Sequence, residues 1–252
     1  VLLLVGLVYW PGMSGGFVFD DYSNLVDNNR TVISDLGWAQ IKQAALASDS
    51  SVFHRPLVMV SLAVQRYFTG LNPFPMKVVN LGIHLLNTFL IYFLLKALLS
   101  HAVREPFGQR HIVSPATLAL LVAAGWALAP INLTGVLFII QRMESLAACF
   151  TLLGLLVYLH GRLRLMAGFR FGLLWMWGGI IGGVVIGVLA KETAVMLPVY
   201  AILIEWLFFG LGDRGSSDRR KILVLFGVTL LLPAILGLMW LAPRVLTNLD
   251  LG

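Results

Sequence analysis

Long apolar runs recur along this 252-residue sequence and constrain its fold more than any other feature. Hydrophobic residues make up 59% of the chain and charged residues only 12%, against about 25% charged residues in an average soluble domain. So few polar residues cannot cover a soluble core, which excludes a soluble domain and a disordered chain. The sequence therefore predicts an all-α polytopic membrane protein. In such a protein the net charge of +6 indicates cytoplasmic loops and not a nucleic-acid partner.

Seven apolar segments are candidates for membrane spans. They are residues 1–12, 78–99, 114–130, 136–159, 171–190, 193–210 and 222–242. A span needs about 20 apolar residues, so we expect the first segment to be the end of a truncated helix. Residues 1–252 are then predicted to form a single transmembrane domain of about seven helices. One long polar loop, residues 13–77, interrupts it.

The charges predict how these spans are oriented. If the long loop lies outside, ten of the eighteen Lys and Arg residues and four of the twelve Asp and Glu residues fall on the cytoplasmic side, an excess of +6. The outer side then carries eight of each, with no excess. Loops rich in Lys and Arg favour the cytoplasm. We expect the outer face to be the periplasmic face of a bacterial inner membrane or, alternatively, the lumenal face of the endoplasmic reticulum. Glu205 is expected at the cytoplasmic interface.

The long loop is expected to carry structure of its own, because structureless loops beyond about 12–15 residues are uncommon. Residues 31–48 are typical of a short amphipathic helix with Ser34 as its N-cap, and residues 56–68 of a second helix. We expect both helices to lie in the membrane interface, with Trp38 as an anchor. Two solvated loop helices are the alternative.

One helix face within the second span is polar. Asn80, His84 and Asn87 share it by their spacing and must point into the bundle or a wet cavity. One His with two Asn is a poor set of metal ligands, so interhelical hydrogen bonding is predicted. In the fifth span, glycines every four residues from Gly179 to Gly187 predict close helix packing.

Charged residues at the outer ends of the spans indicate chemistry, because a charge at the bilayer centre costs at least ~2.5–3.5 kcal/mol. Asp20 and Asp21 directly follow the first segment. Two adjacent carboxylates are suited to hold a divalent metal ion, or one of them can act as a general base. A solvated loop start is the alternative. Arg55, before Pro56, is suited to bind a phosphate or to face lipid headgroups.

Two more charged pairs fall on the same side of the membrane. Arg142 and Glu144 begin the fourth span, and Lys191 and Glu192 form the turn between the fifth and sixth. Either these residues converge with Arg55 and the two aspartates on one outer pocket, or they form ion pairs that join helix ends. The residues alone leave both alternatives open.

The order of these polar segments resembles one family. The segments are residues 17–22 (Phe-Val-Phe-Asp-Asp-Tyr), 54–57 (His-Arg-Pro-Leu), 79–87, 139–147 and 189–198. In order and spacing they resemble GT-C-type membrane glycosyltransferases, above all the TMTC-type proteins that are similar to protein O-mannosyltransferases, with bacterial relatives that carry tetratricopeptide repeats. The resemblance covers nearly the whole chain.

The resemblance implies an inverting enzyme that transfers a sugar from a polyprenyl phosphate in the membrane to an outward-facing acceptor, a protein Ser/Thr hydroxyl or a glycan. It implies that Asp20 or Asp21 is the catalytic carboxylate, with Asp20 favoured. No cofactor is assigned apart from the divalent metal ion that these two carboxylates are suited to hold. The cations expected to stabilise the donor phosphate are Arg55, Arg142 and Lys191. The residues expected to support the site are Lys77, Asn80, His84, Glu144 and Glu192.

This sequence departs from the family pattern at several points. Relatives often carry His-Pro and then Thr-Glu before the fourth span, where residues 129–134 read Ala-Pro-Ile-Asn-Leu-Thr, and a His where Lys77 stands. Tetratricopeptide repeats are absent from residues 1–252. These departures favour an alternative function, that of a catalytically inactive accessory subunit in a larger membrane complex. A transporter is disfavoured because the sequence contains no inverted repeat.

Overall fold

The structure is a computed structural model that describes residues 1–102, 113–211, 217–231, 233–235 and 237–239. These residues form helices and turns, with no strand among them. The α-helices are α1 (Leu2–Tyr9), α2 (Trp38–Ala45), α3 (Pro56–Thr69), α4 (Pro73–Ala102), α5 (Pro115–Ala127), α6 (Leu133–Leu137), α7 (Arg142–Met166), α8 (Gly172–Val188), α9 (Leu197–Ile204) and α10 (Ser217–Phe226). The 3-10 and π segments are η1 (Trp10–Ser14), η2 (Tyr22–Val26), η3 (Asn29–Thr31), η4 (Pro130–Asn132), η5 (Glu192–Met196), η6 (Glu205–Phe209) and η7 (Gly227–Leu231). The all-α prediction is confirmed.

Several of these helices are suited to cross a membrane. Four stretches of the described chain are long and apolar enough: Pro73–Ala102, Arg142–Met166, Glu192–Phe209 and Asp218–Met239. A fifth is added if Pro115–Ala127 and Pro130–Leu137, bent by 54°, count as one span. Leu2–Ser14 and Gly172–Val188 are apolar but shorter; the latter reaches about 25 Å, less than the ~30 Å of the hydrocarbon core. The membrane-protein prediction is confirmed. Within the described ranges, helix length and composition support four or five spans, and the predicted seven are not confirmed. The predicted seventh segment ends outside the described residues.

The predicted fourth span, residues 136–159, starts too early. Pro130 lacks an N–H and cannot continue the helix of α5, and Asn132 Nδ2 donates to the carbonyl of Trp126 at 2.6 Å, which satisfies the end of that helix. The short helix α6 then continues at 54°. Phe138 leaves the helical conformation with a ψ of 120°, and α7 begins only after a further turn.

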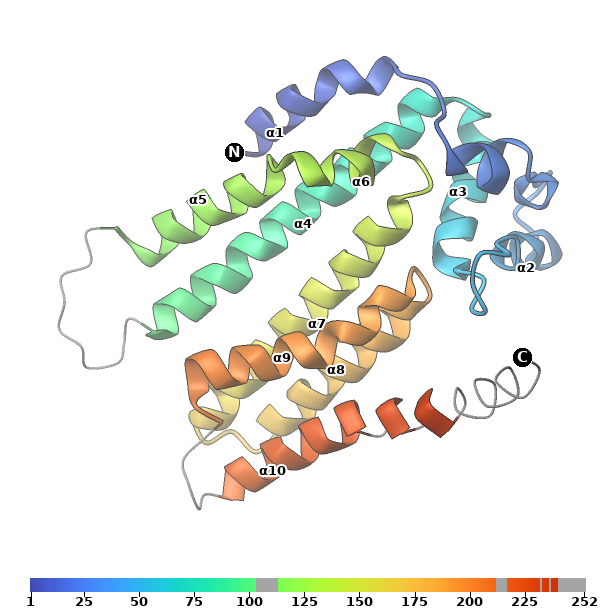
Figure 1. Ribbon diagram of the computed structural model, residues 1–252. Coiled ribbons are helices and arrows are strands. Elements are labelled where there is room, and N and C mark those ends of the chain that lie inside the picture. The colour runs from blue at the N-terminus through green and yellow to red at the C-terminus, as the bar shows by residue number, and fades with distance from the viewer. Residues whose placement is uncertain (103–112, 212–216, 232, 236, 240–252) are drawn as a thin grey trace, which may run out of the picture.

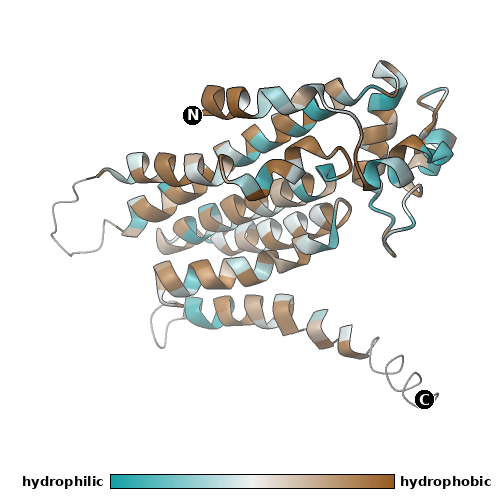
Figure 2. Ribbon diagram, turned by 45° about the horizontal axis from the view of Figure 1, so that its top comes forward, coloured by the Kyte–Doolittle hydropathy of each residue, from teal (hydrophilic) through white to brown (hydrophobic). Residues whose placement is uncertain are grey.

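The long helices lie side by side, and the polar loop forms a lobe at one end of them (Figure 1). We define the lobe as residues 15–72, which contain η2, η3, α2 and α3. Hydrophilic residues gather in the lobe, whereas the bundle is mostly hydrophobic (Figure 2). We call the bundle end next to the lobe the lobe end. The other end, where α4, α7 and η6 finish, is the far end.

The lobe carries two helices, as predicted, but one has different bounds. The second, α3, matches the predicted residues 56–68 closely. The first, α2, begins only at Trp38, and its N-cap is Gly37. The prediction of Ser34 as the N-cap is wrong, because its hydroxyl instead accepts a hydrogen bond from Gln40 Nε2 at 2.7 Å. Trp38 is 80% exposed, and its anchoring role remains a prediction.

Close packing of α7 on α8 forms the centre of the bundle. A Cβ atom added at Gly179 would lie 2.6 Å from the carbonyl oxygen of Gly154, and one added at Gly183 would lie 3.1 Å from the Gly154 Cα. The two backbones therefore touch, as the glycine spacing predicts.

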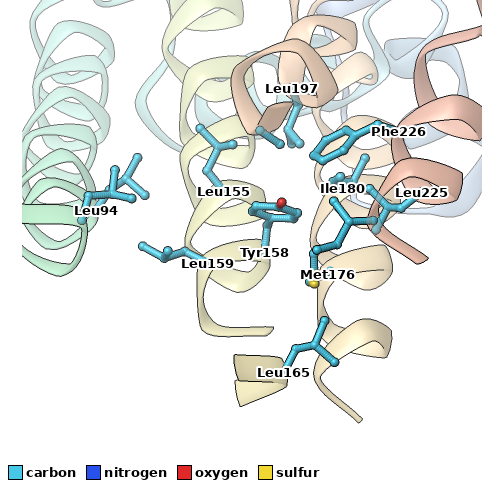
Figure 3. Close-up of a cluster of buried hydrophobic side chains, with 13 residues drawn as sticks. Leu94, Leu155, Tyr158, Leu159, Leu165, Met176, Ile180, Leu197, Leu225 and Phe226 are labelled. Atoms are coloured by element: carbon cyan, nitrogen blue, oxygen red, sulfur yellow. The ribbon is translucent and has the colours of Figure 1, made fainter. Parts of the chain in front are cut away.

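The largest hydrophobic cluster surrounds this contact. It brings together buried side chains from α4, α7, α8, α9 and α10 (Figure 3). Tyr158 is fully buried among Leu155, Met176, Ile180 and Phe226. The cluster fixes α7, and α7 carries charged groups at both of its ends.

Candidate functional site

Asp20 and Asp21 follow a strained residue at the start of the lobe and have opposite environments. Phe19 has a φ of 46°, which is costly for a bulky residue. Asp21 is fully buried, and its carboxylate accepts hydrogen bonds from the backbone N–H groups of Val18 at 3.1 Å and Ile140 at 2.8 Å. Asp20 is exposed. Asp21 thus ties the lobe to the bundle, while the side chain of Asp20 faces outward.

Arg142 lies inside the protein and not at a surface. Its side chain is 1% exposed. Its Nε donates to Asn80 Oδ1 at 2.8 Å, and its Nη2 donates to Gln65 Oε1 at 2.6 Å and to the Met76 carbonyl at 3.1 Å. A further bond joins its Nη1 to Ser61 Oγ at 3.3 Å. Arg142 therefore links α3, α4 and α7 through neutral acceptors, and its contact with a donor phosphate stays a prediction.

Lys77 is the second buried cation at the lobe end. It is 3% exposed, and its ammonium group donates to the carbonyls of Gly12 at 3.3 Å and Gly15 at 2.8 Å. It also interacts electrostatically with the carboxylate of Asp21. Lys77 therefore holds the chain as it leaves η1 and enters the lobe.

The polar face of α4 makes the interhelical hydrogen bonds that the sequence predicts. Asn80 Nδ2 donates to the carbonyl of Ile139 at 3.3 Å. His84 Nε2 lies 3.0 Å from the carbonyl of Ala127, and Asn87 Nδ2 donates to the carbonyl of Ser145 at 2.8 Å. All three side chains are buried. This face joins α4 to α5 and α7.

Two ion pairs connect the lobe, α7 and the turn after α8. Arg55 Nη2 lies 3.3 Å from Glu192 Oε2, and Lys191 Nζ pairs with Glu144 Oε1. Arg55 has a φ of 48° and the preceding His54 has a φ of 55°. With Phe19, these are three of the four non-glycine residues of positive φ in the described chain. Backbone strain is therefore concentrated beside the charged residues, a pattern that points toward a functional site.

A cavity of 430 Å³ opens between α4, the α5–α6 bend and α7 at the lobe end. We call it the polar cavity. Its polar lining includes His84, Asn87, Gln141, Glu144 and Lys191. A volume of this size is typical of small-molecule sites, which run from about 300 to 1,000 Å³.

A second cavity of 510 Å³ adjoins the polar cavity. We call it the apolar cavity, because its walls include Ile91, Leu152 and Leu155. Trp126 and Glu144 line both cavities. The two cavities therefore share part of their walls, and a polar space at the lobe end lies next to a less polar one.

The structure gathers only part of the predicted site around these two cavities. His84, Glu144 and Lys191 line the polar cavity. The predicted residues outside its lining are Asp20, Asp21, Arg55, Lys77, Asn80, Arg142 and Glu192. Trp126 and Gln141 line the cavity but were not predicted, because an isolated Trp in an apolar run and a Gln at a helix start carry no distinctive signal.

No cluster of three or more His, Cys, Asp or Glu side chains suited to a metal ion occurs within the described ranges. Both oxygens of Asp21 accept backbone hydrogen bonds. A divalent ion at Asp20 and Asp21 therefore stays a prediction from the sequence.

The fold and the site define an all-α integral membrane protein with a polar cavity at the lobe end of its bundle and an apolar cavity next to it. Over 150 residues, 57% of this chain, the sequence is 29% identical to human protein O-mannosyl-transferase TMTC4. The matched region is 20% of the length of that relative. No protein-family model matches the chain, and no solved structure matches it.

Proposed function

We propose that this protein is a membrane glycosyltransferase that uses a polyprenyl-phosphate sugar and works on the lobe side. The observation that carries the proposal is that a polar cavity and an apolar cavity lie next to each other and share Trp126, Glu144 and Ala148 in their walls. A lipid phosphate sugar is an amphiphile whose head group fits the first cavity and whose isoprenoid chain fits the second. The similarity to TMTC4, named as a protein O-mannosyl-transferase, supports the same class of reaction.

The charge distribution at the lobe end supports an anionic donor. The buried charged residues there are Lys77, Arg142 and Asp21, two cations and one anion. Their excess of one positive charge acts through a medium of low dielectric constant, where its field is stronger than in water. Lys191 is the cation that lines the polar cavity. In this proposal Lys191 contacts the donor phosphate, and Arg142 contributes its charge without touching it.

The proposed reaction is a single displacement at the anomeric carbon of the donor sugar. The oxygen of an acceptor hydroxyl forms a bond to this carbon as the bond to the phosphate oxygen breaks, which inverts the configuration. Asp20 accepts the hydroxyl proton as general base. The lipid phosphate leaves with its negative charge stabilised by Lys191. Asp21 is a positioning residue, because its bond to the N–H of Ile140 fastens Asp20 beside the turn that carries Gln141.

We further propose a protein Ser/Thr hydroxyl as the acceptor and the periplasmic face of a bacterial inner membrane as the place of reaction. The exposed lobe next to Asp20 is suited to meet a protein from outside the bilayer. The same chemistry fits the lumen of the endoplasmic reticulum.

The proposal is tested by sugar transfer in isolated membranes supplied with labelled polyprenyl-phosphate sugars. We expect transfer by the wild type and a loss of about 10²–10⁴-fold in Asp20→Asn, the range for a general base. Asp27→Asn, an exposed lobe aspartate, is the matched control and should keep wild-type activity. Equal activity of Asp20→Asn and the wild type would refute the assignment of the base.

One observation favours the alternative of an inactive accessory subunit. Each cation predicted to bind phosphate already has partners inside the protein: Glu192 for Arg55, Glu144 for Lys191, and four acceptors for Arg142. These contacts are sufficient for a structural role of the three cations. Absence of transfer from several donors, together with a larger membrane protein that co-purifies at fixed stoichiometry, supports this alternative.

A further inference from the structure

Asn87 has an unused hydrogen-bond acceptor in the wall of the polar cavity. Its side chain is 1% exposed. Its Nδ2 donates to the Ser145 carbonyl at 2.8 Å, but its Oδ1 is buried without a hydrogen-bond partner among the described residues. Leaving such an acceptor unpaired costs about 1–3 kcal/mol. Because Asn87 lines the polar cavity, a shift of its side chain toward the cavity would give this shielded atom a ligand hydroxyl as its partner.

Gln141 brings an unpaired side-chain amide to the same cavity. Its side chain lines the cavity and makes no hydrogen bond to any residue that the structure describes. Its backbone follows Ile140, whose N–H is held by Asp21. The amide of Gln141 is thus anchored by its backbone and offers both a donor and an acceptor.

An aromatic ring completes the lining. Trp126 lines the cavity and stacks on His84 with ring centroids 5.0 Å apart. His84 lies 3.0 Å from the carbonyl of Ala127, so the indole packs against an imidazole that is itself held in place. A fixed aromatic surface near two amides suits a ring that is polar at its edges and less polar on its faces.

We propose that the polar cavity is the sugar-binding subsite of the donor, and that Asn87 and Gln141 determine which sugar is accepted by bonding its hydroxyl groups. This inference rests on the proposed function and specifies its substrate recognition. Sites that hydrogen-bond a substrate hydroxyl reject analogues that lack it, because their own polar groups are then left unpaired. Selectivity between sugars should therefore depend on these two amides.

The test is a binding measurement that does not require transfer. The purified protein in nanodiscs is titrated with farnesyl phosphate carrying mannose, glucose or galactose, and with farnesyl phosphate alone. We expect the wild type to bind at least one of the sugar-bearing lipids about tenfold or more tightly than the bare lipid phosphate. Gln141→Leu and Asn87→Leu should each remove most of this advantage and leave the affinity for farnesyl phosphate unchanged.

Gln43→Leu is the matched control, because Gln43 is an exposed glutamine of the lobe that bonds only to the carbonyl of Arg30. Gln141→Leu keeps the test decisive if Asn87→Leu does not fold, since no described contact of the Gln141 side chain is lost. Wild-type binding with no preference for any sugar overturns the proposal, as does an unchanged preference in Gln141→Leu.

This binding measurement and the transfer assay in membranes, read together, separate the inference from the proposed function. Sugar-dependent binding without transfer keeps the subsite and rejects the transferase. Transfer by the wild type with the same sugar preference in Gln141→Leu keeps the transferase and rejects the subsite.

Discussion

The two ends of α7 each bury an arginine, but only the arginine at the far end has a buried counter-charge. At the far end, Arg162 is 5% exposed and its Nε donates to both oxygens of the fully buried Glu205, at 2.8 and 3.0 Å. Tyr158 donates to the same carboxylate at 2.7 Å. At the lobe end, Arg142 is 1% exposed and bonds only to neutral acceptors. At the far end the charge of the arginine is balanced by a buried carboxylate, whereas the buried residues at the lobe end have an excess of positive charge.

This difference indicates that one end of α7 contributes to stability and the other end to function. In a buried ion pair with both partners present, the two opposite charges cancel, so the pair exerts little net field on its surroundings. The lobe end buries charge without full compensation beside a cavity, which is costly and is expected where a charged substrate binds. The comparison therefore predicts that substitutions at the far end change folding alone, whereas activity and donor binding depend on residues at the lobe end.

The largest expected effect is that of Asp20→Asn, compared with Asp21→Asn. The first should lower transfer by about 10²–10⁴-fold with no change in melting temperature, because the Asp20 side chain is exposed. The second should lower the melting temperature, because Asp21 holds two backbone N–H groups. Transfer rates in membranes and thermal unfolding in detergent measure the two. A fall in stability of Asp20→Asn equal to that of Asp21→Asn contradicts the division of roles.

The second prediction concerns the far end. Glu205→Gln should lower the free energy of unfolding by about 3–5 kcal/mol, because it leaves Arg162 buried without its counter-charge. Transfer per folded molecule should stay at the wild-type level. Unfolding in a denaturing detergent titration measures the first quantity. The double variant Arg162→Met/Glu205→Leu serves as the control and should recover most of the loss. A large drop in transfer by folded Glu205→Gln would show that the far end also contributes to the activity of the candidate site.

The apolar pattern of the sequence predicted the helices well and their exact extent less well. The second span and α3 were predictable because long apolar runs and a proline at a first turn act locally. The start of α7 was missed, since the bend after Pro130 depends on a bond from Asn132 to Trp126. The sequence predicted Glu205 at the cytoplasmic interface. In the structure it is instead fully buried, and Tyr158 donates a hydrogen bond to it.

The candidate site was predictable as a list of charged residues but not as an arrangement. The order of the polar segments put Glu144 and Lys191 on one side of the membrane, and these two residues do pair. The burial of Arg142 depends on acceptors from three helices, which no local pattern encodes. The cavity itself arises from the packing of α4, the α5–α6 bend and α7, so Trp126 and Gln141 could not be assigned to it beforehand.

The third prediction concerns the surplus charge at the lobe end. Arg142→Gln should weaken binding of the lipid phosphate roughly tenfold, because it removes one buried positive charge near the donor. It should also lower stability by about 1–3 kcal/mol, since Asn80 and Gln65 lose their donor. Titration with farnesyl phosphate and thermal unfolding measure these quantities. Arg142→Lys is the control that keeps the charge but not the planar fork, and it should restore binding more than stability. Equal binding by all three proteins contradicts a role for this charge.

The smallest expected effect is that of Glu192→Gln, which breaks the pair with Arg55. The Glu192 side chain is 39% exposed and that of Arg55 is 16% exposed, so solvent screens much of their attraction. We expect a loss of stability of about 0–1 kcal/mol, measured by thermal unfolding beside Asp218→Asn, whose exposed pair with Lys221 at the far end is the matched comparison. Because the charge of Arg55 is then released beside the site, binding of farnesyl phosphate should rise slightly in Glu192→Gln and stay constant in Asp218→Asn. If Glu192→Gln lowered the free energy of unfolding as much as Glu205→Gln, the lobe end, like the far end, would depend on ion pairs for its stability.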